Sequence, residues 1–81
     1  MNLYYNVIYT IEYIEGENKG FIFKGILIQE DKNTLQLQDI LADQMFVISK
    51  KRFNEECKIV GQELLSYPIF IPNSTYTTTI L

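Results

Sequence analysis

Three consecutive basic residues, Lys50, Lys51 and Arg52, form a cluster in a chain whose formal net charge is −3. The guanidinium of Arg52 offers a planar fork of donors that matches a phosphate or a carboxylate, and the two lysines add point charges. The cluster predicts a subsite for one nucleotide or an acidic protein patch, because a long nucleic-acid backbone needs more phosphate contacts. The alternative, which the sequence favours, is a solvated turn at the end of a strand.

Tyrosine side chains could complete such a site by stacking on a base or by filling a pocket in a protein partner. Tyr5, Tyr9 and Tyr13 fall on one face of an alternating segment, and Tyr4 leaves this stripe and is expected to be exposed. A stripe of this kind is most often core. The sequence leaves both interpretations open, and Tyr4 and Tyr9 are the candidate contact residues.

Catalytic chemistry has little support in the sequence. The chain has no histidine to act as a general base near neutral pH, and its one cysteine, Cys57, is expected to be a small core residue. Two pairs of adjacent carboxylates, at 30–31 and 55–56, are expected on exposed turns or a helix surface, where they solvate the chain. We therefore expect a protein that is not an enzyme.

Asp31 and Asn33 lie in a predicted turn and are further candidates for contact with a ligand. Together with Glu30 they offer oxygen atoms, but they lack the ordered ligand spacing of a calcium loop. We expect no metal site and no cofactor.

Alternation of apolar and polar residues predicts strands at 2–15, 21–29 and 34–40, and a short apolar strand follows at 45–48. Polar turns at 16–20 and 30–33 separate the first three strands, which are therefore expected to pair as antiparallel neighbours. Gly25 interrupts the second strand, which indicates a bulge, a bend or a close backbone approach.

The C-terminal half is less regular. Apolar residues at helical spacing predict an amphipathic helix over 53–65, whereas Gly61 and a β-type run favour a turn followed by a strand, which we prefer slightly. Pro68 confines a strand at 67–71 to an edge, and the Thr-rich stretch 75–81 is a candidate edge strand. The predicted fold is mainly β, a small bent antiparallel sheet or barrel of five to seven strands; the alternative is α+β with one helix around 50–65.

Residues 23–31 (FKGILIQED), followed by Asn33, Leu35, Leu37 and Asp39, resemble the first motif of Sm-like proteins. That motif has a glycine, an apolar residue two positions later, an acidic residue near the turn, and then Asn and alternating leucines. The resemblance covers roughly residues 21–53. It implies a small SH3-like or Sm-like barrel, with a ring or dimer built through strand edges.

The chain also departs from the Sm-like pattern in two places. In that family the turn Asp and Asn bind RNA bases and stand further apart, whereas Asp31 and Asn33 are separated by one residue. The family's Arg-Gly pair is replaced by Ser49 and Lys50. These departures put the RNA-binding role in doubt and leave the architecture as what the resemblance implies.

Length and composition predict one folded domain over residues 1–81. The chain is 47% hydrophobic and 21% charged, which is typical of a globular protein, but 81 residues bury a thin core, so oligomerisation would add stability. The N-terminus lacks the pattern of a signal peptide, no stretch approaches 18 apolar residues, and the lone cysteine fits a reducing compartment. We expect a cytoplasmic protein.

Two functions remain after these exclusions. The first is a protein–protein interaction or inhibitor module that self-associates through strand edges, of a kind expected in phages or mobile elements. The alternative is an Sm-like protein that binds a nucleotide or short RNA through the basic cluster and an exposed tyrosine. No membrane partner is expected.

Overall fold

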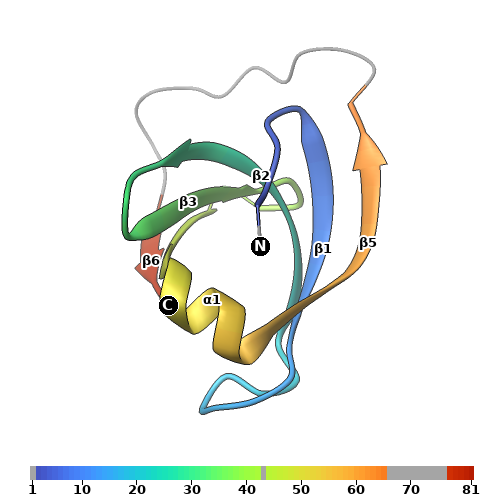
Figure 1. The fold of residues 1–81 in the computed structure, drawn as a ribbon. Helices are drawn as coiled ribbons and strands as arrows, with labels where there is room; N and C mark the ends of the chain where they lie inside the picture. The colour runs from blue at the N-terminus through green and yellow to red at the C-terminus, as the bar shows by residue number, and fades with distance from the viewer. Residues whose placement is uncertain (1, 43, 66–76) are drawn as a thin grey trace.

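The computed structural model describes residues 2–42, 44–65 and 77–81, which form one bent six-stranded sheet and one short helix (Figure 1). The elements in chain order are β1 (Val7–Tyr13), β2 (Ile22–Glu30), β3 (Thr34–Asp39), β4 (Gln44–Ser49), α1 (Lys50–Glu56), β5 (Cys57–Leu64) and β6 (Thr77–Ile80). The strand order is β5-β1-β2-β3-β4-β6, so β5 and β6 are the two margins of a sheet that is not closed. The prediction of a mainly β, bent sheet is confirmed.

β1 shows the alternation that the sequence predicts. Every second residue, beginning with Val7 and ending with Tyr13, is buried, and the residues between them are partly exposed. β1 pairs antiparallel with β2 after a hairpin turn whose two glycines, Gly16 and Gly20, both have positive φ. Glycine is the residue that adopts this backbone conformation without a steric penalty, which is why the turn has one at each end.

β2, β3 and β4 continue as an antiparallel meander. Gly25 marks a close backbone approach, because an added Cβ would lie 3.0 Å from the Phe23 ring and 3.3 Å from the Gln38 carbonyl oxygen. The register of β2 on β3 shifts further along, between Leu27 and Gln29. A bulge of this kind bends the strand and helps the sheet to curl around its core.

Helix and strand both occur in the segment for which the sequence offered them as alternatives. The Ser49 side chain accepts a hydrogen bond from the backbone N–H of Arg52 and so caps α1, which ends after two turns. Cys57 then begins β5, so the preferred interpretation of a strand is confirmed from that residue on. The helical spacing of apolar residues is coincidental beyond Cys57, because Val60 and Leu64 lie on the strand and are exposed.

β6 pairs with β4 in parallel, which makes the sheet mixed. The sequence predicted an antiparallel sheet; the parallel pair arises because the chain between β4 and β6, which includes α1 and β5, is long enough for a crossover. The edge strand predicted within 75–81 is confirmed as β6, and the strand predicted at 67–71 lies outside the described residues.

The core fills the concave side of the bent sheet, with α1 across one end (Figure 1). Its largest fully buried side chains include Tyr9, Tyr13 and Phe53. Ile59 of β5 and Leu81, which follows β6, are partly buried against this cluster. The two marginal strands therefore both contribute to the core while each leaves one backbone edge unpaired within the described part of the chain.

Candidate interaction surface

A bulge divides the β1–β5 pair into two halves. The register shifts between Thr10 and Ile11, so that Val60 is the extra residue on β5. In the half that contains Tyr13 and Cys57, the concave face is covered by Phe53 of α1 and is buried. In the half that contains Val7 and Leu64, Val7 and Tyr9 of β1 are still buried, but Gln62 and Leu64 of β5 are exposed, so the concave face is open on the β5 side.

A hollow of about 640 Å³ occupies this open half, a volume within the range of pockets that hold small ligands or side chains. Its lining includes Tyr4, Tyr5, Val7, Tyr9, Gln62 and Leu64. Tyr4 is 70% exposed and Leu64 is 80% exposed, so large apolar surface faces solvent here. Aromatic and aliphatic side chains in an open hollow are typical of surfaces that bind a partner.

Asn6 sets the position of the two tyrosines. Its φ of 64° is the only positive φ of a non-glycine residue in the described part of the chain, and it turns the backbone just before β1. The carbonyl oxygen of Asn6 accepts a hydrogen bond from Leu65 N–H at 3.0 Å, and the hydroxyl of Tyr9 accepts one from Tyr4 N–H at 2.7 Å. These bonds hold the N-terminal segment against β1 and β5.

The tyrosine stripe is partly core and partly surface. Tyr9 and Tyr13 are buried, whereas Tyr5 is exposed because the turn at Asn6 removes it from the regular alternation of β1. Tyr4 is exposed as predicted. Tyr9, a predicted contact residue, lines the hollow, but only 2% of its surface is exposed, so its ring does not present a face for a base to stack on.

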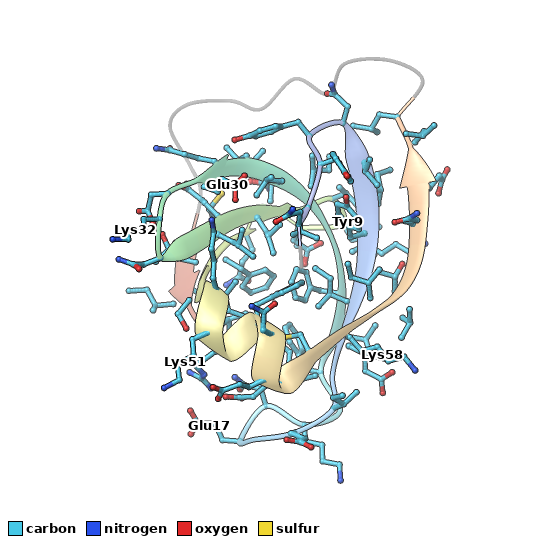
Figure 2. All side chains as sticks on the ribbon, viewed as in Figure 1. Tyr9, Glu17, Glu30, Lys32, Lys51 and Lys58 are labelled. Atoms are coloured by element: carbon cyan, nitrogen blue, oxygen red, sulfur yellow. The ribbon has the colours of Figure 1, made fainter. Side chains whose placement is uncertain are left out.

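The basic cluster is engaged in ion pairs. Lys50 Nζ lies 3.0 Å from a Glu30 carboxylate oxygen. Arg52 Nε lies 3.1 Å from a Glu56 carboxylate oxygen, and Arg52 Nη2 makes a longer contact of 3.6 Å to Glu17. Lys51 is exposed on α1 (Figure 2). Two of the three predicted anion-binding side chains are therefore paired with carboxylates of the chain itself.

Arg52 joins the helix to the β1–β2 hairpin. Arg52 Nε and Nη2 both donate hydrogen bonds to the Glu56 carboxylate, and these bonds raise the pKa of Arg52. Gly16 packs so closely on Glu56 that a Cβ at this position would collide with its carboxylate. The Nε and Nη2 donors of Arg52 are therefore engaged with carboxylates of the chain itself, which weighs against the predicted phosphate-binding role of Arg52.

Asp31 and Asn33 build the turn between β2 and β3. Asp31 Oδ1 accepts hydrogen bonds from Asn33 N–H and Thr34 N–H, both at 2.8 Å, and these backbone bonds lower the pKa of the Asp31 carboxyl. The carbonyl oxygen of Asn33 accepts a bond from Lys50 N–H at 2.8 Å. Both residues have a clear structural role in fixing the turn and the start of α1.

Arg52 and the exposed Tyr4 lie at opposite ends of β1. The helix end that carries Arg52 and Glu56 is bonded to Ile14, just past Tyr13, whereas Tyr4 lies beyond Val7. A seven-residue strand spans roughly 20 Å. The structure therefore does not bring together the arginine and the tyrosine of the predicted nucleotide site.

Tyr13 and Cys57 place two titratable groups in the core. Burial raises the pKa of Tyr13, and the adjacent Cys57 raises it further; burial likewise raises the pKa of Cys57. The Tyr13 hydroxyl is buried without a well-formed hydrogen bond in the described structure. Both groups are neutral near pH 7, and a neutral buried thiol is a poor nucleophile.

The described ranges also contain no cluster of three or more side chains suited to hold a metal ion. Across residues 2–42, 44–65 and 77–81, no helix has the length and apolar character needed to cross a bilayer.

The sequence alone did not reveal the hollow. The sequence left open whether the stripe with Tyr5 is core or surface and whether Leu64 lies on a helix or a strand, and the structure shows both residues exposed. The sequence did contain one sign of the turn that exposes Tyr5. Asn6 follows Tyr4 and Tyr5, and Asn adopts positive φ more readily than most residues. Gly61 was a weaker sign of the bulge in β5, because a glycine within a strand often marks a bulge.

The chain matches no protein-family model, and comparisons with curated proteins and with solved structures found no similar protein.

Proposed function

We propose that this protein is a non-enzymatic interaction module that associates through the unpaired edges of its sheet. The observation that carries the proposal is the open sheet itself, whose marginal strands β5 and β6 both carry exposed aliphatic side chains. Val60 and Leu64 on β5 are 47% and 80% exposed, and Ile80 on β6 is 82% exposed. An unpaired edge with apolar flanks binds an added strand through backbone hydrogen bonds and side-chain contacts.

The hollow beside β5 adds selectivity to this edge. A strand added to β5 passes next to Tyr4, Tyr5 and Leu64, which can receive an apolar side chain from it. Tyrosines are enriched at such contacts because they offer a large rigid area and a polar hydroxyl. A module of this type can act on itself or inhibit a larger protein by covering its surface.

The test is the mass of the protein in solution, by light scattering over a range of concentrations, against the monomer mass of 9.5 kDa. We expect a mass above the monomer value that falls when a lysine is placed on an edge, as in Val60→Lys for β5 or Ile80→Lys for β6. Leu41→Lys is the matched control, since Leu41 is exposed in the β3–β4 turn and lies on neither edge. A mass that neither edge variant changes would contradict association through the edges.

The nucleotide or short-RNA alternative has less support. Lys50 and Arg52 are paired with carboxylates, and Tyr4 lies at the other end of β1 from Arg52. The resemblance to Sm-like proteins stays a prediction. An absorbance maximum near 260 nm in the purified protein, which has six tyrosines and no tryptophan, would favour this alternative.

A further inference from the structure

The hydrogen bonds between β1 and β5 show which backbone groups of β5 point away from β1. Glu56 O accepts from Ile14 N–H at one end of the pair, and Leu65 N–H donates to Asn6 O at the other. In an antiparallel ladder the backbone groups of successive residues point to alternate sides. The N–H and C=O groups of Cys57, Ile59, Gln62 and Leu64 therefore point away from β1, to the edge that no described strand occupies.

The side chains of β5 follow the faces of their partners on β1. Ile59 and Gln62 lie opposite Ile11 and Tyr9 and so belong to the concave face. Lys58 and Glu63 lie opposite Glu12 and Ile8 and belong to the convex face.

The bulge at Val60 produces this arrangement. Lys58 and Glu63 are five positions apart, so in a regular strand they would point to opposite faces. The extra residue shifts the alternation by one and places both on the same face. The extra residue also places Ile59 and Gln62, which are three positions apart, together on the concave face.

β5 is consequently complementary to itself in the antiparallel direction. With a dyad axis between Val60 and Gly61, Ile59 of one copy faces Gln62 of the second copy, and each has its backbone groups directed at the other. Lys58 then faces Glu63 of the second copy on the same surface. Shifting the strands by two residues in either direction loses this pairing of opposite charges.

Charge and exposure agree with this register. Lys58 and Glu63 are both exposed, and neither makes an ion pair with any other residue in the described ranges. Facing each other at a non-hydrogen-bonded position, where cross-strand side chains come closest, they would form two symmetric ion pairs. Val60, half exposed, would lie opposite Gly61 of the second copy, next to the dyad.

We propose that β5 pairs antiparallel with β5 of a second copy, with the dyad between Val60 and Gly61. This inference rests on the proposed function and specifies which edge is used and with what partner. The pairing joins two six-stranded sheets into one continuous sheet across the dyad.

Disulfide trapping tests the register directly. A Lys58→Cys/Glu63→Cys variant, made with Cys57→Ala to remove the native thiol, is expected to form a covalent dimer under mild oxidation. The single variants Lys58→Cys and Glu63→Cys should not, because identical positions lie several residues apart across the dyad, but mixing the two should give a crosslinked pair. Crosslinking of the single variants alone at the level of the double variant would overturn the register.

Charge reversal provides a non-covalent test. Lys58→Glu or Glu63→Lys places like charges opposite each other twice per dimer, and we expect sedimentation equilibrium to show dimerisation weakened about tenfold. Lys58→Glu/Glu63→Lys restores opposite charges and should recover the wild-type affinity, with circular dichroism confirming that each variant folds. Failure of the double variant to recover would overturn the Lys58–Glu63 pairing.

The same measurements separate this inference from the proposed function. Dissociation by Ile80→Lys but by neither charge reversal would overturn the β5 dimer and leave association through edges in place, at β6. A wild-type chain that stays monomeric at every concentration would overturn the β5 dimer and self-association together. Binding to a different protein that Val60→Lys weakens would then still support use of the β5 edge.

Discussion

The two halves of the β1–β5 pair differ in what covers them. On one side of the bulge, Tyr13 and Cys57 are buried in one cluster with Phe53 of α1. Arg52 joins that helix to the β1–β2 hairpin through Glu17. On the other side of the bulge, Tyr5, which precedes β1, and Leu64 of β5 are exposed to solvent around an open hollow. One strand pair therefore supplies both core and exposed surface.

This difference separates residues that hold the fold from residues available for binding. We call the half with Tyr13, Phe53 and Cys57 the closed end and the half with Tyr5 and Leu64 the open end. A small domain has few buried side chains, so each one at the closed end accounts for a large share of its stability. The exposed side chains at the open end contribute little to folding and can be changed without unfolding the chain. Substitutions at the two ends should therefore give different phenotypes.

The largest effect is expected at the closed end. Phe53→Ala removes a ring that is 1% exposed and leaves a cavity under α1, which should lower the free energy of unfolding by about 3–5 kcal/mol. Leu64→Ala at the open end should change it by less than about 0.5 kcal/mol. Urea unfolding followed by circular dichroism measures both, and equal losses at the two ends would contradict the comparison.

Alkaline pH should destabilise the closed end next. Because burial raises the pKa of Tyr13 above its ordinary value of 10.0, the unfolded chain releases this proton at a lower pH than the folded chain does. The contribution of Tyr13 to stability is fully present below pH 10 and is lost above it, at up to about 1.4 kcal/mol per pH unit. Cys57, whose pKa is also raised, begins the loss from about pH 9.

Tyr13→Phe isolates that contribution. The variant lacks the buried hydroxyl and should lose stability less steeply above pH 10 than the wild type in thermal unfolding at successive pH values. Tyr5→Phe is the control, since Tyr5 is exposed and should leave the slope unchanged. The same slope for Tyr13→Phe and the wild type would show that Tyr13 ionises freely in the folded state.

The smallest effect concerns the turn that forms the open end. Asn6→Ala places a Cβ-bearing residue without a polar side chain at φ 64°, which should cost about 1 kcal/mol, whereas Asn6→Gly should be nearly neutral. Thermal unfolding compares the two. A loss that is the same for alanine and glycine would indicate that the Asn6 side chain, and not its backbone conformation, matters.

Local patterns in the sequence predicted the parts of the fold that depend on neighbouring residues. Alternation predicted β1, β2 and β3, and glycine and Asx residues predicted both turns between them. The end of α1 at Glu56 was harder to predict, because Phe53 and Cys57 point into one core from a helix and from a strand. Helical spacing cannot distinguish that arrangement from a longer helix.

The candidate site depended on contacts between distant parts of the chain. Lys50 and Arg52 form a basic cluster in sequence, but Glu30 and Glu17, which pair with them, come from distant parts of the chain and could not be identified from spacing. Glu56 could be, because it stands four residues after Arg52 in the segment where a helix was one of the two alternatives. Tyr4 could be predicted as exposed because it leaves the stripe. Leu64 could not, since its exposure follows from a sheet that stays open beside it.

The bulge at Val60 also bears on how large an assembly can become. An irregular edge is a poor template for a regular strand, so it disfavours addition of chain after chain in the manner of a fibril. Pairing across a dyad uses the β5 edge of both copies and leaves no β5 edge for a third copy. One extra residue in β5 thus favours a finite complex over an endless one, which matters for an 81-residue chain with so much exposed apolar surface.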